Sequence, residues 1–244
     1  MTGPGGAHLL QSRVLEDLRG AHNYRRWLVS LVDPYLGDDP IEIGSGLGDY
    51  AAELVGGRAS YTATEADPDR VAVLARRFVD HPVVRVRPLS LPADEAGEHS
   101  AALLLNVLEH IRDDVAALRC AASLARPGGA VVVFVPAFPF AMSRFDRLIG
   151  HHRRYTRRSL AAALTGAGLR VERVRYVNSV GLASWFLLMR CARMIPRDGF
   201  ALRCYDATVI RVVARAERRI RPPFGQSVLA VARVPGDPGG EGDR

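Results

Sequence analysis

Lysine is absent from this sequence, and arginine supplies all 33 of its basic residues other than histidine. The absence excludes Schiff-base enzymes, lysine general bases and the phosphate-binding lysine of a P-loop. The net charge of +7 makes nucleic-acid binding an alternative to weigh. The arginines are spread along the chain, however, and this distribution favours solvated surfaces over a polyanion site. Together with abundant alanine, glycine and valine, the arginine usage indicates a GC-rich bacterial genome.

Long apolar runs and paired cysteines are lacking too. No stretch reaches the roughly 18 apolar residues that span a bilayer, and the Gly/Pro-rich segment 1–7 does not have the pattern of a signal peptide. The three cysteines, Cys120, Cys191 and Cys204, form neither a CxxC motif nor a metal-binding spacing. We therefore expect a cytoplasmic protein with no transmembrane segment, with reduced thiols and with no metal site.

The 244 residues, 48% of them apolar and 24% charged, fit one globular domain. Short apolar runs alternate with helical patterns, which predicts an α/β protein with a Rossmann-like, doubly wound sheet. We expect seven strands, at residues 40–43, 61–65, 83–89, 101–105, 130–135, 169–176 and 227–234. Helical patterns occupy residues 8–36, 47–55, 67–79, 113–125, 156–167, 180–195 and 206–219.

The expected domain organisation has three parts. Residues 1–36 are an N-terminal helical cap, residues 37–234 are the α/β domain, and residues 235–244 are a disordered tail. A helical lid at about 178–222 precedes the last strand. Within it, segment 180–189 is apolar on nearly every side, and two interpretations stay open: a helix packed on the domain or at a homodimer contact, or the wall of an apolar substrate pocket. A membrane-surface helix ranks third because a polar face is nearly missing.

The first strand, Pro40–Ile43, runs into a turn with glycine at three alternate positions, Gly44, Gly46 and Gly48. Glycine permits a sharp bend and the close approach of a ligand. Glu65 ends the next apolar run, where α/β nucleotide sites place the carboxylate that binds ribose hydroxyls. A dinucleotide would require the third glycine one residue later, and the acidic residues of this turn disfavour a phosphate group.

This turn resembles motif I of the class I S-adenosylmethionine (SAM) dependent methyltransferases, with Glu42 at its acidic position. Segment Asn106–His110, with Val-Leu-Glu-His after the fourth strand, resembles the corresponding segment of the same family. The resemblance covers roughly residues 36–176. It implies the class I methyltransferase fold, SAM as cofactor, and a cofactor-binding set of Glu42, Gly44, Ser45, Gly46, Gly48, Glu65, Ala66, Ser90, Leu91, Asn106 and Val107. Ser90 departs from the pattern, because the family usually has an adenine-binding aspartate there.

A loop rich in aromatic and basic residues, 138–154, is expected after the fifth strand, and segment 145–156 is the strongest candidate for substrate chemistry. Its stretch Gly150–Thr156 is similar to the G-H-x-R-R-Y-T segment of bacterial methyltransferases of types 11 and 12. Imidazole and phenol groups can accept protons, so the candidate catalytic residues are His110, His151, His152 and Tyr155. Two structural alternatives stay open: His110 as a helix-capping residue, and Tyr155 as part of a helix entry capped by threonine.

The resemblance implies a SAM-dependent methyltransferase that acts on a small molecule of apolar character at oxygen, nitrogen or carbon, in bacterial natural-product or envelope biosynthesis. One alternative is a SAM-binding enzyme with another reaction, such as a cyclisation, and a second is a non-catalytic SAM-binding subunit. Methylation of nucleic acids is disfavoured. Asn106 is not followed by the Pro-Pro pair of amino-base enzymes, and all three cysteines follow arginine where a cytosine enzyme needs Pro-Cys.

Overall fold

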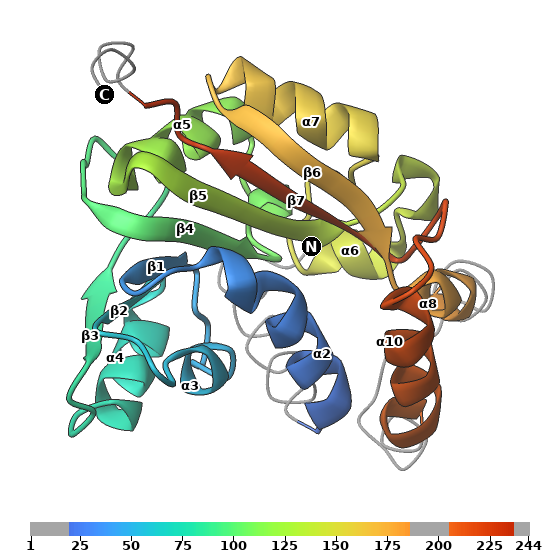
Figure 1. Ribbon diagram of the computed structural model, residues 1–244, viewed down its shortest axis with the longest axis horizontal. Coiled ribbons are helices and arrows are strands. Elements are labelled where there is room, and N and C mark those ends of the chain that lie inside the picture. Colours follow the sequence, from blue (N-terminus) through green and yellow to red (C-terminus); the bar gives the residue numbers. More distant parts are fainter. Residues whose placement is uncertain (1–19, 186–204, 237–244) are drawn as a thin grey trace, which may run out of the picture.

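The computed structural model describes residues 20–185 and 205–236 and has a seven-stranded sheet at its centre, with helices on both faces (Figure 1). The strands lie in the order β3-β2-β1-β4-β5-β7-β6, and only β7 runs antiparallel to its neighbours. Their bounds are β1 Pro40–Ile43, β2 Tyr61–Glu65, β3 Val84–Pro88, β4 His99–Leu105, β5 Ala125–Pro136, β6 Arg170–Val177 and β7 Ser227–Arg233. The predicted fold class is confirmed.

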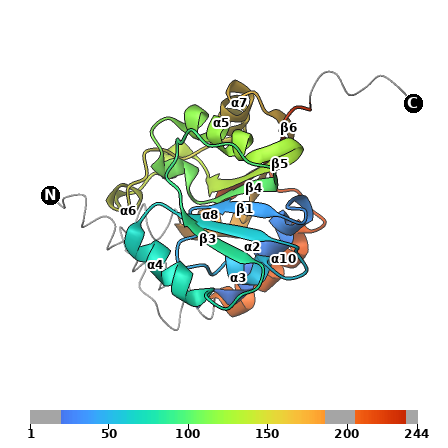
Figure 2. The ribbon, with the colours of Figure 1, turned by 90° about the vertical axis from the view of Figure 1, so that its left-hand side faces the viewer.

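The helices form two layers. On one face lie α5 (Asp114–Leu124) and α7 (Arg157–Gly166); on the other lie α2 (His22–Val32), α3 (Ala51–Leu54), α4 (Pro68–Arg77) and α10 (Arg211–Glu217) (Figures 1 and 2). Strand β4 shows why both faces are covered. Ala102 and Leu104 pack with α5 and α7, whereas Ala101, Leu103 and Leu105 pack with the other layer. Because successive side chains of a strand point to opposite faces, this continuous apolar strand is buried on both sides.

Local sequence signals set several helix starts. Asp67 caps α4 by accepting hydrogen bonds from the backbone nitrogens of Asp69 and Arg70, and Pro68 occupies the first turn. Thr156 and Ser159 form a reciprocal capping box at the start of α7. These two helices start where the sequence predicts them, because the capping signals are local.

Three segments differ from the prediction. Helix α3 is shorter than the expected 47–55, because the turn continues to residue 50. The expected turn at 127–129 lies inside β5, where a register shift against β4 marks a bulge. The expected loop at 138–154 contains the short helices η3 (Pro139–Ala141) and α6 (Arg144–Leu148).

The predicted lid corresponds to α8 (Ser179–Trp185), the π-helical turn η5 (Asp206–Ile210) and α10. The parts of the predicted helices that fall on residues 8–19 and 186–195, and the tail beyond 236, lie outside the described residues. Within the described part of the chain, no helix is long and apolar enough to cross a membrane.

Candidate active site

The predicted glycine turn lies at the carboxyl end of β1, beside the ends of β2 and β4. Strand order reverses between β1 and β4, and ligands of doubly wound sheets bind at such a switch point. Gly44, Gly46 and Gly48 have φ of +72°, +58° and +81°, a region that favours glycine. A Cβ on Gly44 would lie 2.6 Å from Val107 Cγ2, and one on Gly48 would lie 2.7 Å from the Phe78 ring. Two of the glycines are therefore required by packing as well as by backbone conformation.

Glu65, at the end of β2, points its carboxylate at this turn and is buried. Its Oε2 accepts a hydrogen bond from the Gly46 backbone nitrogen at 2.9 Å. Its Oε1 accepts from the backbone nitrogens of Ala66 and Asp67, at 2.9 and 3.2 Å, and from Arg70 Nη2 at 3.1 Å. A carboxylate offers about four acceptor positions, so Oε2 keeps capacity for one more donor while Oε1 is fully engaged.

Glu42 is a second buried carboxylate under the turn, only 1% exposed. Its Oε2 accepts a hydrogen bond from the Tyr61 hydroxyl at 3.1 Å. Burial raises the pKa of Glu42 to about 7, and the charges of Glu65 and Asp49 add to that effect, while hydrogen bonds with Ser45 and Tyr61 oppose it. Acidic side chains therefore lie under and beside the turn, and they favour a ligand with cationic or amino groups over a phosphate.

The other predicted cofactor residues border the same edge of the sheet. Ala66 and Ser90 are exposed beyond the ends of β2 and β3, and Leu91 next to Ser90 is half-buried. Asn106 follows β4 with φ of +54° and is exposed, and Val107 packs against Gly44. The structure therefore brings the predicted cofactor set to one edge of the sheet, with Glu42 and Ser45 buried under the turn.

Two of the four candidate catalytic residues, His110 and His151, lie together beside the side chain of Glu109. His110 and Glu109 belong to η2 (Leu108–His110), and His151 comes from the loop after α6. The rings of His110 and His151 are 4.6 Å apart between centroids, edge to face, and His151 Nε2 is 3.8 Å from Glu109 Oε1. Burial raises the pKa of Glu109 to about 7 and lowers that of His110 to about 3. At neutral pH His110 is therefore uncharged.

His151 is held by a buried ion pair. Its Nδ1 lies 3.0 Å from Asp146 Oδ1, and Arg154 Nη2 lies 2.7 Å from the same oxygen. Asp146 also completes a capping box with Ser143 at the start of α6. Burial alone would raise the pKa of Asp146, but the hydrogen bond from His151 and the charge of Arg154 hold it well below its usual range. The sequence prediction omitted Asp146 and Arg154; the Ser-x-x-Asp spacing signalled the cap, but no local pattern signalled the ion pair.

The other two candidates lie outside this cluster. His152 is exposed; partial burial and the charges of Arg112 and Arg153 lower its pKa. Tyr155 is buried, and its hydroxyl donates to Asp114 Oδ2 at 2.9 Å, so burial and that carboxylate raise its pKa well above the usual range. This placement suits Tyr155 for joining the segment to α5 in the core.

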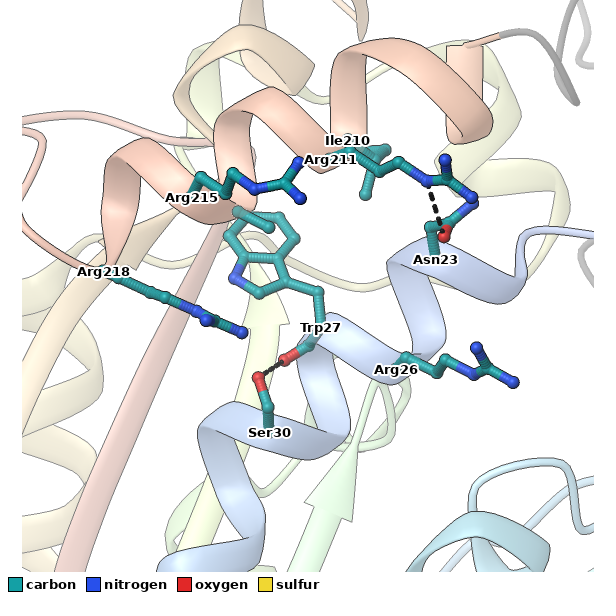
Figure 3. A pocket seen from close by; sticks show the side chains of 9 residues that line it. Asn23, Arg26, Trp27, Ser30, Ile210, Arg211, Arg215 and Arg218 are labelled. Atoms are coloured by element: carbon teal, nitrogen blue, oxygen red, sulfur yellow. Dashed lines mark hydrogen bonds between the residues drawn. The ribbon is translucent and has the colours of Figure 1, made fainter.

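A separate groove of about 300 Å³ lies between α2 and the η5–α10 segment (Figure 3). Arg215 of α10 and Arg218, directly after α10, lie beside the Trp27 indole of α2, whereas Arg211 turns to Asn23 and donates to its Oδ1 at 3.2 Å. The indole nitrogen has no hydrogen-bond partner in the described part of the chain. The residues around the groove are Asn23, Arg26, Trp27, Ser30, Ile210, Arg211, Ala214, Arg215 and Arg218, and none of them belongs to the predicted site.

Comparisons with solved structures show the same fold. The complex of the Haloferax volcanii Trm112 methyltransferase activator with a putative methyltransferase matches with a TM-score of 0.61 and 16% identity over 93% of this chain and 97% of that one. The [4+2]-cyclase SpnF matches with a TM-score of 0.59 and 21% identity over 86% of this chain and 81% of that one. Geranyl diphosphate methyltransferase in complex with GPP and sinefungin matches with a TM-score of 0.60 and 14% identity over 85% of this chain and 77% of that one.

No curated protein matches the sequence. A family model, Methyltransf_23, described as a methyltransferase domain, matches residues 15–174 and so covers most of the chain. The finer likeness to types 11 and 12 stays a prediction. With the strand order and the glycine turn, this match shows that the chain belongs to the methyltransferase domain family, as an enzyme with the class I SAM-dependent methyltransferase fold.

Proposed function

We propose that this chain binds SAM at the glycine turn and transfers its methyl group to a small molecule, at oxygen, nitrogen or carbon. One observation carries the proposal: the Glu65 carboxylate is fixed against the Gly46 backbone nitrogen at 2.9 Å. An acid at the end of the second strand thereby joins the turn after the first, which is the arrangement a ribose-binding carboxylate requires.

The residues at the turn fit this cofactor. Glu65 would accept from the ribose hydroxyls, Glu42 and the turn Gly44–Gly48 would surround the methionine moiety, and the exposed Asn106 would face the acceptor molecule. Oε2 of Glu65 has room for one ribose hydroxyl, whereas Oε1 already accepts from three donors, so a second hydroxyl would have to displace donors there, including Arg70 Nη2 at 3.1 Å.

SAM supplies a methyl group on a good leaving group, so the protein's main task is alignment. Holding the acceptor and the methyl carbon in line can account for roughly 7–11 kcal/mol of the barrier. A general base is needed only when the acceptor loses a proton during transfer. We propose His110 and His151 for that role because the structure brings their rings together; His152 and Tyr155 stay predictions with less support from their positions.

The acceptor is proposed to be apolar in part, because α8 begins the apolar segment of the predicted lid and Val180 is 43% exposed. A role in bacterial natural-product or envelope biosynthesis, a cytoplasmic location and a homodimer belong to the same proposal. The rest of the apolar segment lies outside the described residues.

A second function has a specific observation in its favour. The chain has the fold of SpnF, a [4+2]-cyclase, at 21% identity. A SAM-binding enzyme that catalyses a cyclisation therefore stays an alternative, as does a non-catalytic SAM-binding subunit. The complex with the Trm112 activator shows that chains of this fold can work with a partner protein.

Calorimetric titration with SAM, S-adenosylhomocysteine and NAD tests the cofactor. We expect both SAM compounds to bind and NAD not to bind. Glu65→Gln keeps the shape of the side chain but loses its charge; charged hydrogen bonds contribute about 1.5–3 kcal/mol, so affinity should fall roughly 10- to 100-fold. Glu172→Gln, on the edge strand β6, is the matched control.

Normal SAM binding by Glu65→Gln would contradict the site assignment. Mass analysis of the products then separates the alternatives, because only methyl transfer adds a methyl group and releases S-adenosylhomocysteine. Binding without turnover on any acceptor favours the non-catalytic subunit.

A further inference from the structure

Glu109, His110 and His151 point one ligand atom each into a common space, all within 4.8 Å of one another. The three residues come from two segments about forty positions apart: η2 after β4, and the loop after α6. We propose that this cluster binds a divalent transition-metal cation, of the kind that imidazole and carboxylate ligands bind together. This inference does not depend on SAM binding, because it rests on the cluster alone.

The first support is the state of the Glu109 carboxylate. Glu109 is 0% exposed, and neither of its carboxylate oxygens has a hydrogen-bond partner among the residues that the structure describes. Burying an ionised carboxylate without hydrogen bonds is costly, and buried charges are normally paired or bound to a metal. The nearest cationic side chain of the local ion pair, Arg154, lies against Asp146. A cation between Glu109 and the imidazoles would give these two oxygens the partner that they lack among the described residues.

The second support is the orientation of His151. Asp146 Oδ1, 3.0 Å from Nδ1, fixes the proton on that nitrogen, since an ionised carboxylate can only accept. The other ring nitrogen, Nε2, faces Glu109 Oε1 at 3.8 Å. This distance is too long for a hydrogen bond. Two atoms that each lie about 2.1 Å from one ion are at most about 4.2 Å apart, so a cation fits between them.

The third support is the surrounding layer of hydrogen bonds. Metal-binding histidines usually donate their second ring nitrogen to a carboxylate or a backbone carbonyl, which fixes the tautomer and the ring. His151 has this contact with Asp146, and His110 has a hydrogen bond with the Gly150 backbone. Arg154 and the Ser143 cap in turn hold Asp146. The two histidines are thus oriented before any ion arrives.

The donor set indicates which cations fit. Two imidazoles with one carboxylate suit zinc, iron, cobalt or nickel better than magnesium or calcium, which prefer oxygen ligands. Three protein ligands leave at least one coordination position open. The cluster directly follows Asn106 and Val107 on the edge of the sheet that carries the proposed cofactor site. If that proposed function holds, an oxygen of the acceptor could occupy the open position, where a Lewis acid lowers the pKa of a hydroxyl.

The sequence argued against a metal because no carboxylate cluster or cysteine spacing was visible. The structure supplies a different kind of donor set, in which one carboxylate is joined by two histidines. The second histidine comes close only through the fold of segment 144–151, since α6 and the pair Asp146–Arg154 set the position of that loop. Sequence spacing cannot show this contact.

Metal binding can be measured on the full chain without any substrate. Untagged protein is treated with a chelator, desalted and titrated with Zn²⁺, and in parallel with Mg²⁺, by calorimetry; Co²⁺ gives a visible absorption band as a second readout. We expect one Zn²⁺ per chain, much weaker Mg²⁺ binding, and a rise in Tm with Zn²⁺ because the ligand binds only the folded state.

The variants Glu109→Gln and His151→Ala should each weaken Zn²⁺ binding at least 100-fold and abolish the Co²⁺ band. His22→Ala, an exposed histidine on α2, is the matched control and should bind like the unaltered protein. Circular dichroism checks that each variant is folded, and Glu109→Gln keeps the size of the buried side chain.

Zn²⁺ binding that is equal in all variants, or absent from the unaltered protein, would overturn the proposal. SAM titration of the same samples distinguishes the two proposals of this section and the previous one. SAM binding without metal binding would contradict the proposed metal site and leave the proposed function intact. Metal binding without SAM binding would contradict the proposed function and leave the metal site intact.

Discussion

At the scale of single residues, the site is dominated by carboxylates that the fold has buried. Glu42, Glu65 and Glu109 lie close to the carboxyl ends of β1, β2 and β4, and each is at most 5% exposed. Glu65 accepts from four donors of its own neighbourhood and keeps free capacity at Oε2. Buried acids with raised pKa values concentrate at functional sites, and Glu42 and Glu109 have this property.

The raised pKa of Glu42 predicts a pH dependence of stability. The pKa is about 7 in the folded protein against 4.5 in the unfolded chain, so ionisation is more costly in the folded state. The contribution of protonated Glu42 to stability is fully present below pH 4.5 and is lost as the pH rises to about 7. The difference between these two pKa values corresponds to about 3 kcal/mol. Glu42→Gln cannot ionise and should gain this stability relative to the unaltered protein between pH 4.5 and 8.

Urea unfolding of both proteins at several pH values measures the difference. Glu172→Gln serves as the control, because its side chain lies on the edge strand β6 and pairs with Arg233 near the surface. A stability difference between Glu42→Gln and the unaltered protein that stays constant from pH 4.5 to 8 would show that the environment of Glu42 does not penalise its charge.

At the scale of elements, the chain joins its first described helix to its last. Helix α2 begins after Ala21 and has no side-chain cap of its own. Asp206 of η5, 183 positions from Asn23, supplies one: its Oδ2 accepts from the Asn23 backbone and side chain at 2.9 and 3.0 Å, and its Oδ1 accepts from the Tyr24 backbone at 2.8 Å. Helix α2 and η5 are therefore held together by this carboxylate.

Asp206→Ala should accordingly destabilise the protein by about 2 kcal/mol. The change leaves backbone donors at the start of α2 unsatisfied, and a lost helix cap typically costs about 1 kcal/mol, with the buried charge-assisted bonds adding to it. Chemical denaturation measures the loss, with Asp69→Ala on the exposed start of α4 as a milder comparison. If Asp206→Ala is as stable as the unaltered protein, the long-range cap does not hold α2.

At the scale of the whole molecule, the proposed cofactor site lies on the central strands. Strands β1 and β4 occupy the middle of the sheet, and both helical layers pack on them. A ligand that binds the folded state there should stabilise the entire domain and not only a local segment. The residues around the groove between α2 and the η5–α10 segment do not belong to the proposed cofactor site, so the groove plays no part in this prediction.

S-adenosylhomocysteine at 100 times its Kd should therefore raise the free energy of unfolding by about 2.7 kcal/mol. For a domain of this size that is a rise in Tm of roughly 5–10 °C. Thermal unfolding followed by circular dichroism gives the readout, and Glu65→Gln at the same ligand concentration should show a much smaller rise. An unchanged Tm of the unaltered protein in the presence of saturating ligand would contradict the proposed cofactor.

Much of this fold follows from local sequence signals. The alternation and continuity of apolar residues mark all seven strands, because side-chain periodicity is a property of neighbouring positions. Asp67 and Thr156 mark two helix starts for the same reason. The glycine turn and Glu65 also sit at fixed offsets from their strands, so the sequence alone places both at one edge of the sheet.

Contacts between distant segments were decided only by the tertiary structure. Glu109 and His151 meet because α6 and the Asp146–Arg154 pair hold the loop against η2, and Asp206 reaches α2 across the chain. The contact of the Tyr155 hydroxyl with Asp114 of α5 is likewise a contact between distant segments. Periodicity and capping depend on residues a few positions apart, whereas these pairings depend on how whole elements pack, and one-dimensional spacing carries no record of that packing.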